Sequence, residues 1–312
     1  MFLKKVRISL TKKILPLIYK FVQILKSNTR TINYLNDKRI DVIKTYDFRK
    51  SIKELIGDKK LVGLDVGAQG GFNSDKFFPE KYEDYFEIVE VDPLIKSSSK
   101  NKKKSIINKG LWSSKGQRKL YVLENRPESS SMFEPDKDSL EIYDFKEKDF
   151  SLFNVSKTEM IECDTLSNSL KELKINNLDY LKIDTQGAEL EILKGMGAFR
   201  PLMIKCEIRI FPMYKNEPRW TVIIDYLYSL GYILCEWRNI GSHSTRSPVE
   251  MDMVFIPNFS NDLGKSLIRT KQDYFISLML ITGQIKILKK IAKILKLQHT
   301  EIYMGIEDKY FN

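Results

Sequence analysis

Short apolar segments separated by glycine, proline and asparagine turns fill the chain from residue 61 onward. Several are almost continuously hydrophobic, which is typical of parallel strands buried on both faces. Helical stretches alternate with them, as in successive βαβ units. We therefore expect a doubly wound α/β sheet. The predicted strands are Leu61–Val66, Phe86–Val91, Lys119–Leu123, Leu178–Ile183, Leu202–Ile208, Gly231–Trp237 and Met251–Ile256.

The two ends of the chain have a different pattern. Residues 1–57 are basic and helical in character, with Pro16 breaking the first segment, and carry no cluster that suggests chemistry. From Gln272 to Leu297, apolar residues follow one helical face and lysines the others. We expect an N-terminal extension at 1–57, a catalytic domain at 58–258 and a C-terminal amphipathic helical extension at 259–312.

The basic helices at the ends allow two interpretations. The favoured one docks the C-terminal helix on its own domain, with its lysines in water. The alternative is a peripheral membrane contact through the basic terminal helices.

Two further stretches read as loops. Residues 96–104 are rich in serine and lysine, and residues 124–150 mix proline, serine and charged residues with little periodicity. The second stretch is long enough to serve as a lid or a substrate loop.

The net charge of +11 belongs to the ends of the chain. Residues 1–60 hold 16 basic and 5 acidic residues, whereas residues 61–260 hold 27 basic and 31 acidic residues. A central region with this balance does not attract polyanions. We therefore expect no nucleic-acid partner.

The three cysteines lie in strand-like segments without CxxC spacing, so neither a disulfide framework nor a zinc site is indicated. A reduced, cytoplasmic setting is the simplest expectation. Lys20 interrupts the apolar stretch near the N-terminus, and no small-residue cleavage site follows it. No uncharged apolar run reaches about 18 residues, so we expect neither a signal peptide nor a transmembrane helix.

The first predicted strand carries Asp65 and runs directly into a glycine loop, Gly67-Ala68-Gln69-Gly70-Gly71. A strand that feeds such a loop binds ligands at its carboxyl end. Glycines allow positive φ and a close approach of the backbone to a ligand. The spacing is not GxGxxG, which argues against a dinucleotide.

A second acidic position follows one βαβ step later, in the segment Ile88-Val89-Glu90-Val91-Asp92-Pro93. A carboxylate at a strand end can accept hydrogen bonds from both hydroxyls of a ribose. We favour Asp92 over Glu90 for this role. The alternative is that Asp92 only caps a turn before Pro93.

The third segment joins a buried strand to a helix that ends at Gly195. Asp184 follows this strand, where the central strands of doubly wound sheets present catalytic groups, and Glu189 lies in the first turns of the helix. The alternative for Glu189 is that it only complements the helix dipole.

Together these segments resemble the FkbM family of methyltransferases. The resemblance covers about residues 58–258 and is strongest in Ile183-Asp184-Thr185-Gln186-Gly187-Ala188-Glu189, with Leu193-Lys194-Gly195 after it. Relatives often have Glu-Pro where this chain has Asp92-Pro93, and either acid can hold a ribose. The other matching segments are Asp65-Val66-Gly67-Ala68, Val91-Asp92-Pro93, Cys206-Glu207-Ile208, Leu230-Gly231-Tyr232 and Met251-Asp252-Met253-Val254-Phe255.

The resemblance implies a Rossmann-like class I methyltransferase fold whose last strand runs antiparallel. It implies S-adenosylmethionine (SAM) as cofactor and a hydroxyl of a sugar, glycan or polyketide-type natural product as small-molecule acceptor. The oligomeric state stays open. The cofactor residues expected by analogy are Gly67, Ala68 and Gly70 at the methionine end, beside Asp65; Asp92 at the ribose; and Leu111 and Trp112 near the adenine.

Methyl transfer is an in-line displacement from a sulfonium, so the enzyme must align the acceptor oxygen and exclude water. A base then helps to remove the hydroxyl proton. Asp184 is the first candidate for this base, followed by Glu207 and Glu189. We expect no metal, because Asp184 and Glu207 lack an evident third ligand.

Two other functions compete with this interpretation. Base-methylating enzymes usually carry Asn or Asp before Pro-Pro-aromatic after the central strand, to hold a flipped base. Here that place reads Asp184-Thr185-Gln186-Gly187. A non-catalytic, membrane-peripheral module is the second competitor, and the intact glycine loop and acids argue against it.

Overall fold

The computed structural model describes residues 46–94, 104–123, 125–141, 151–241 and 249–306, with the backbone alone for 238–241. Its centre is a seven-stranded sheet in the order β3-β2-β1-β7-β8-β10-β9. In that order the strands are Lys104–Ile107, Phe86–Val91, Leu61–Val66, Tyr180–Ile183, Met203–Arg209, Glu250–Pro257 and Tyr232–Gly241.

Most strands of this sheet are parallel, and β10, the last in the chain, is antiparallel to both of its neighbours. This confirms the predicted Rossmann-like fold with its antiparallel last strand. The strand order reverses between β1 and β7, and open α/β sheets bind ligands at the carboxyl ends of the strands on either side of such a switch point.

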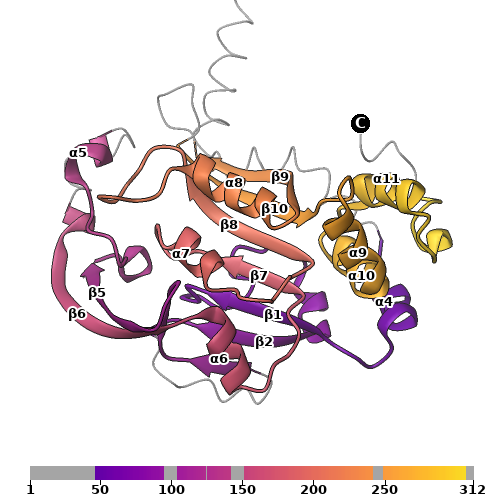
Figure 1. Ribbon diagram of the computed structural model, residues 1–312, viewed down its shortest axis with the longest axis horizontal. Coiled ribbons are helices and arrows are strands. Elements are labelled where there is room, and N and C mark those ends of the chain that lie inside the picture. Colours follow the sequence, from indigo (N-terminus) through magenta and orange to yellow (C-terminus); the bar gives the residue numbers. More distant parts are fainter. Residues whose placement is uncertain (1–45, 95–103, 124, 142–150, 242–248, 307–312) are drawn as a thin grey trace, which may run out of the picture.

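A second sheet of three strands lies beside the carboxyl ends of the first (Figure 1). Its order is β4-β6-β5, with bounds Gly110–Leu111, Val155–Asp164 and Gly116–Leu123. The predicted strand Lys119–Leu123 is part of β5, so it belongs to this sheet and not to the main one. The segment between the two long strands contains a 3-10 turn, η2 at Pro127–Ser129, and the short helix α5 at Lys137–Leu140.

Three helices cover one face of the main sheet (Figure 1). They are α6 at Leu166–Glu172, α7 at Glu189–Lys194 and α8 at Trp220–Ser229. Their apolar side chains form one core with every second residue of the strands, such as Leu64, Leu181 and Ile204.

The opposite face carries an aromatic layer built by the segment after the glycine loop. Phe72, Phe77 and Phe78 pack against Phe86 of β2 and Tyr180 of β7, with ring centroids 5.2 to 6.3 Å apart. The 3-10 segment η1, Glu80–Tyr85, completes this layer on the way to β2.

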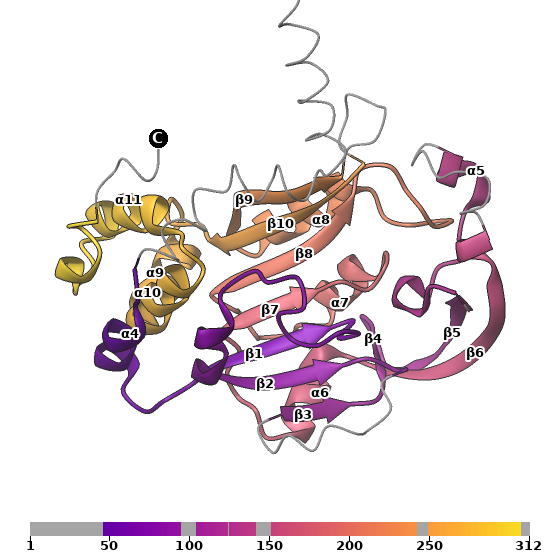
Figure 2. The ribbon, with the colours of Figure 1, turned by 180° about the vertical axis from the view of Figure 1, so that it is seen from behind.

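Helices from both ends of the described chain pack into the same core as the aromatic layer. They are α4 at Arg49–Ile56, α9 at Asp262–Thr270, α10 at Gln272–Ile281 and α11 at Ile285–Leu295, followed by the 3-10 turn η5 at Thr300–Ile302. Figures 1 and 2 show α4, α10 and α11 beyond the amino end of β1, opposite the end that enters the glycine loop.

The apolar face of α11 is used inside the protein. Ile285, Leu288 and Ile291 are fully buried in this core, whereas Lys286 and Lys290 are exposed. The helix therefore has the docked arrangement that the sequence favoured. In the described part of the chain, every helix is too short or too polar to cross a bilayer.

Buried ion pairs cross the aromatic-layer face of the sheet toward its carboxyl end. The Lys182 Nζ atom lies 3.0 Å from Asp65 Oδ1, and both side chains are at most 5% exposed. On the neighbouring strands Lys104 pairs with Glu90, and Lys205 pairs with Asp252. Burial raises the pKa of Asp65 to about 6, against the opposing effect of Lys182.

We expect Lys182→Met to destabilise the protein by about 3–5 kcal/mol, because it leaves a buried carboxylate without its partner. Asp65→Asn should cost less in the Lys182→Met background than in the wild type, since the ion pair is then already broken. Urea unfolding of the two single variants and the double variant measures both effects. Additive losses would contradict this account.

Candidate functional site

A cavity opens at the carboxyl ends of β1, β2 and β7, at the switch point of the sheet. Its volume is about 550 Å³ when the open space at its mouth is included. The lining residues on the strand side are Val66, Gly67, Gln69, Val91, Asp92, Pro93, Leu94, Lys109, Gly110, Leu111, Asp184, Thr185, Gln186, Ala188 and Ile192.

The glycine loop touches the backbone that follows β7. Gly67 has a φ of 82°, and a Cβ atom there would lie 1.8 Å from the carbonyl oxygen of Asp184. Its N–H donates to Val91 O at 2.9 Å. Only glycine can adopt this φ and also leave room for the Asp184 carbonyl. Gly67 therefore brings the ends of three adjacent strands together around the cavity.

The two acids of β2 have different positions. Glu90 Oε1 accepts hydrogen bonds from the Phe72 N–H at 3.2 Å and from Lys104 Nζ at 2.6 Å, which anchors the segment after the glycine loop. Asp92 lines the cavity and is 5% exposed. Its Oδ1 atom also accepts from the Leu94 N–H at 2.7 Å, so the turn foreseen as the alternative role is present as well.

The residues predicted to hold a cofactor divide into two groups. Gly67, Asp92 and Leu111 line the cavity. The Trp112 indole packs instead against the Phe133 ring at 5.8 Å and the Arg118 guanidinium at 4.6 Å. The predicted residues outside the lining are Asp65, Ala68, Gly70 and Trp112.

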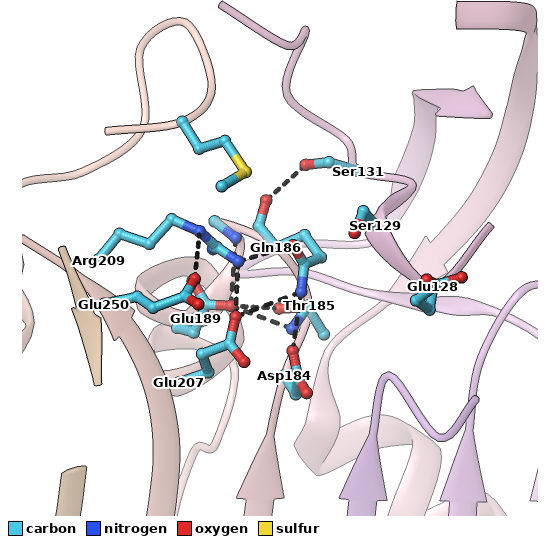
Figure 3. Close-up of polar contacts among 12 residues, drawn as sticks. Glu128, Ser129, Ser131, Asp184, Thr185, Gln186, Glu189, Glu207, Arg209 and Glu250 are labelled. Atoms are coloured by element: carbon cyan, nitrogen blue, oxygen red, sulfur yellow. Dashed lines mark hydrogen bonds and ion pairs between the residues drawn. The ribbon is translucent and has the colours of Figure 1, made fainter. Parts of the chain in front are cut away.

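The candidate bases Asp184 and Glu207 lie on either side of one glutamine (Figure 3). Gln186 Nε2 donates to Asp184 Oδ1 at 3.0 Å and to Glu207 Oε1 at 3.4 Å. Of the two acids, Asp184 lines the cavity. Burial and the nearby Asp184 carboxylate raise the pKa of Glu207 well above its usual range.

The third candidate, Glu189, faces the backbone of its own loop. It is 2% exposed, and its Oε1 atom accepts from the N–H groups of Thr185 at 3.0 Å and Gly187 at 3.2 Å. The Thr185 hydroxyl donates to the same oxygen at 3.1 Å. Burial raises the pKa of Glu189, and the carboxylate closes the turn that leads into α7.

The far wall of the cavity comes from the segment predicted as a lid or substrate loop. Glu128, Ser130, Ser131 and Met132 line it, together with Leu120. Two hydrogen bonds attach this wall to the loops on the strand side: Ser131 Oγ donates to Gln186 O at 2.6 Å, and Gln69 Nε2 donates to Pro127 O at 3.3 Å. Residues 96–103, 124 and 142–150 of the two predicted loops lie outside the described residues.

Sequence reasoning did not single out Gln186, Ser131 or Lys109, all of which line the cavity. Ser131 could have been found from the run Ser129-Ser130-Ser131, and Gln186 from its place in the Asp-Thr-Gln-Gly motif. Across the described ranges, no three His, Cys, Asp or Glu side chains are grouped as they would be to hold a metal ion.

The strand order, the antiparallel last strand and the cavity at the switch point are those of a class I methyltransferase. The sequence profile of the methyltransferase FkbM domain matches residues 65–234. The chain therefore belongs to the FkbM methyltransferase family, as its motifs predicted. It is a SAM-dependent methyltransferase.

No curated protein matches the sequence. One solved structure that it resembles is the 1,6-didemethyltoxoflavin-N1-methyltransferase of Burkholderia thailandensis, bound to 1,6-didemethyltoxoflavin and S-adenosylhomocysteine. The identity is 8% and the TM-score 0.30, over 77% of this chain and 90% of that chain.

We expect Gly67→Ala to destabilise the protein more than Gly57→Ala does. Both glycines have positive φ, which is unfavourable for an alanine. A Cβ atom at Gly57 meets nothing within 4 Å, whereas one at Gly67 collides with Asp184 O. Urea unfolding compares the two variants, and equal losses would show that the contact of the two loops is not tight.

Proposed function

We propose that this enzyme transfers the methyl group of SAM to a hydroxyl oxygen of a sugar, a glycan or another natural product. One observation carries the proposal: Asp184 lines the same cavity as Gly67 and Asp92. An acid suited to accept a proton thus borders the space that residues suited to a nucleoside ligand enclose.

The proposed cofactor contacts follow the strand ends. The glycine loop, with Gly67 at its start, would meet the methionine end of SAM through its backbone. The Asp92 carboxylate would accept hydrogen bonds from the ribose hydroxyls, and Leu111 would pack near the adenine. Asp65 and Trp112 would support these contacts from behind the lining.

In the proposed reaction, SAM supplies a methyl group on a sulfonium sulfur. The acceptor oxygen attacks the methyl carbon as the carbon–sulfur bond breaks, and S-adenosylhomocysteine and a methyl ether are the products. Asp184 would take the hydroxyl proton. Glu207 would act beside it, and Glu189 would hold the turn before α7.

The proposed acceptor side is the wall formed by residues 128–132. This wall is fastened to the loop after β7 by the Ser131 hydrogen bond, so it can align an acceptor and exclude water. We further propose that residues 58–258 form the catalytic domain. The helices of 259–312 would then stabilise it, because α10 and α11 dock at the end of the sheet opposite the cavity.

We expect Asp92→Ala to weaken SAM binding by about 1–3 kcal/mol, since charge-assisted hydrogen bonds to the ribose are lost. Isothermal titration with SAM measures the change. Asp58→Ala is a matched control, because the same truncation is made at an exposed acid outside the cavity. Unchanged affinity in Asp92→Ala would refute the ribose contact.

We expect Asp184→Asn to lower turnover by about 10²–10⁴-fold while SAM still binds, because the base is lost and the shape is kept. The assay uses SAM carrying a tritiated methyl group with a panel of methyl glycosides and polyhydroxylated natural products. Parallel reactions with amines and with RNA test the choice of a hydroxyl acceptor. Near-normal turnover in Asp184→Asn would assign the base to Glu207 or Glu189, and methylation of only amines or RNA would overturn the proposal.

A further inference from the structure

Gln186 has an unusual backbone conformation at the edge of the cavity. Its φ is 61°, in the left-handed region that is energetically unfavourable for residues other than glycine. Such a conformation persists where the surrounding structure holds it firmly, and it is frequent at active sites. Here the Ser131 hydroxyl donates to the Gln186 carbonyl at 2.6 Å, so the main chain is held from the opposite wall.

The side-chain amide of Gln186 is held in one orientation. Arg209 Nη2 donates to its Oε1 atom at 2.6 Å, and the Tyr214 hydroxyl lies 3.0 Å from the same oxygen. Arginine can only donate, so the amide oxygen must face it and the NH₂ group must face away. That NH₂ group points to Asp184 and Glu207 (Figure 3).

Arg209 itself is fixed. It is fully surrounded, with 2% of its side chain exposed, and it bonds to Glu207 Oε1 at 2.6 Å. Glu217 and Glu250 lie within 4.0 Å of other guanidinium nitrogens. A flip of the Gln186 amide would place NH₂ against this buried cation, so the orientation is locked.

We propose that Gln186 is a positioning residue, which donates a hydrogen bond from its NH₂ group to the Asp184 carboxylate and so holds it in place beside Glu207. The inference rests on the proposed function of Asp184 as the base. The Glu207 and Asp65 carboxylates repel the charge of Asp184, and the Lys182 ammonium attracts it. A hydrogen-bond donor between Asp184 and Glu207 offsets the repulsion of these two. Within the described residues, Gln186 provides the one hydrogen bond to the Asp184 carboxylate.

Titration of the Asp184 carboxyl tests the proposal without any acceptor. The full chain is labelled with carbon-13 at its aspartate carboxyl groups, and the Asp184 signal is assigned by its loss in Asp184→Asn. In Gln186→Met, which keeps the length of the side chain and removes the amide, the midpoint of this signal should move up by about one pH unit.

Gln69→Met is the matched control. Gln69 also lines the cavity, but its amide donates to Pro127 O and, in the described part of the chain, to neither carboxylate, so the Asp184 midpoint should stay at its wild-type value. Tyr214→Phe keeps the ring and removes a hydroxyl that bonds to the Gln186 oxygen at 3.0 Å and to Ser129 O at 2.8 Å. It should move the midpoint in the same direction as Gln186→Met, and by less.

An unchanged Asp184 midpoint in Gln186→Met and Tyr214→Phe would overturn the inference, as would an equal shift in Gln69→Met. If Gln186→Met does not fold, the Tyr214→Phe titration decides alone. This readout is separate from the proposed function: normal turnover of Asp184→Asn would remove the base assignment, whether or not Gln186 controls the ionisation of Asp184.

Discussion

The cavity depends on one contact between two backbones, where the glycine loop after β1 meets the carbonyl of Asp184 after β7. This contact leaves no room for a side chain at Gly67 and sets how far apart the two strand ends lie. The cofactor side and the acid side of the cavity are therefore parts of one rigid arrangement. The anchors beneath it are buried charges, with Glu90 holding the segment after the loop and Lys182 pairing with Asp65.

The acids around the cavity are distinguished by what surrounds them and not by their distance along the chain. Glu189 is used by the backbone of its own turn, Glu207 by Arg209, and Asp184 alone of these three reaches the cavity lining. Gln186 connects the last two. Three carboxylates of similar chemistry can thus have three different duties in the same small region.

The sequence was sufficient for the central strands and for the residues at their ends. Strands β1, β2, β7, β8 and β10 are buried and apolar, so their pattern is strong, and the motifs at Gly67, Asp92 and Asp184 fall at their ends. It was insufficient for β6, because most of that strand is exposed and its polar residues resemble a loop. The wall at residues 128–132 and the role of Gln186 arise from contacts between distant segments, which no local pattern records.

The packing of α4 against α10 also bears on the order in which the protein is completed. These helices are separated by more than 200 residues, yet they share one apolar core, and among the described strands the edge strand β9 pairs only with the later strand β10. Contacts of such long sequence separation form slowly, because a large loop must close first. During synthesis the sheet therefore cannot be completed before β10 has left the ribosome, and the packing of α4 against α10 must wait until α10 follows it.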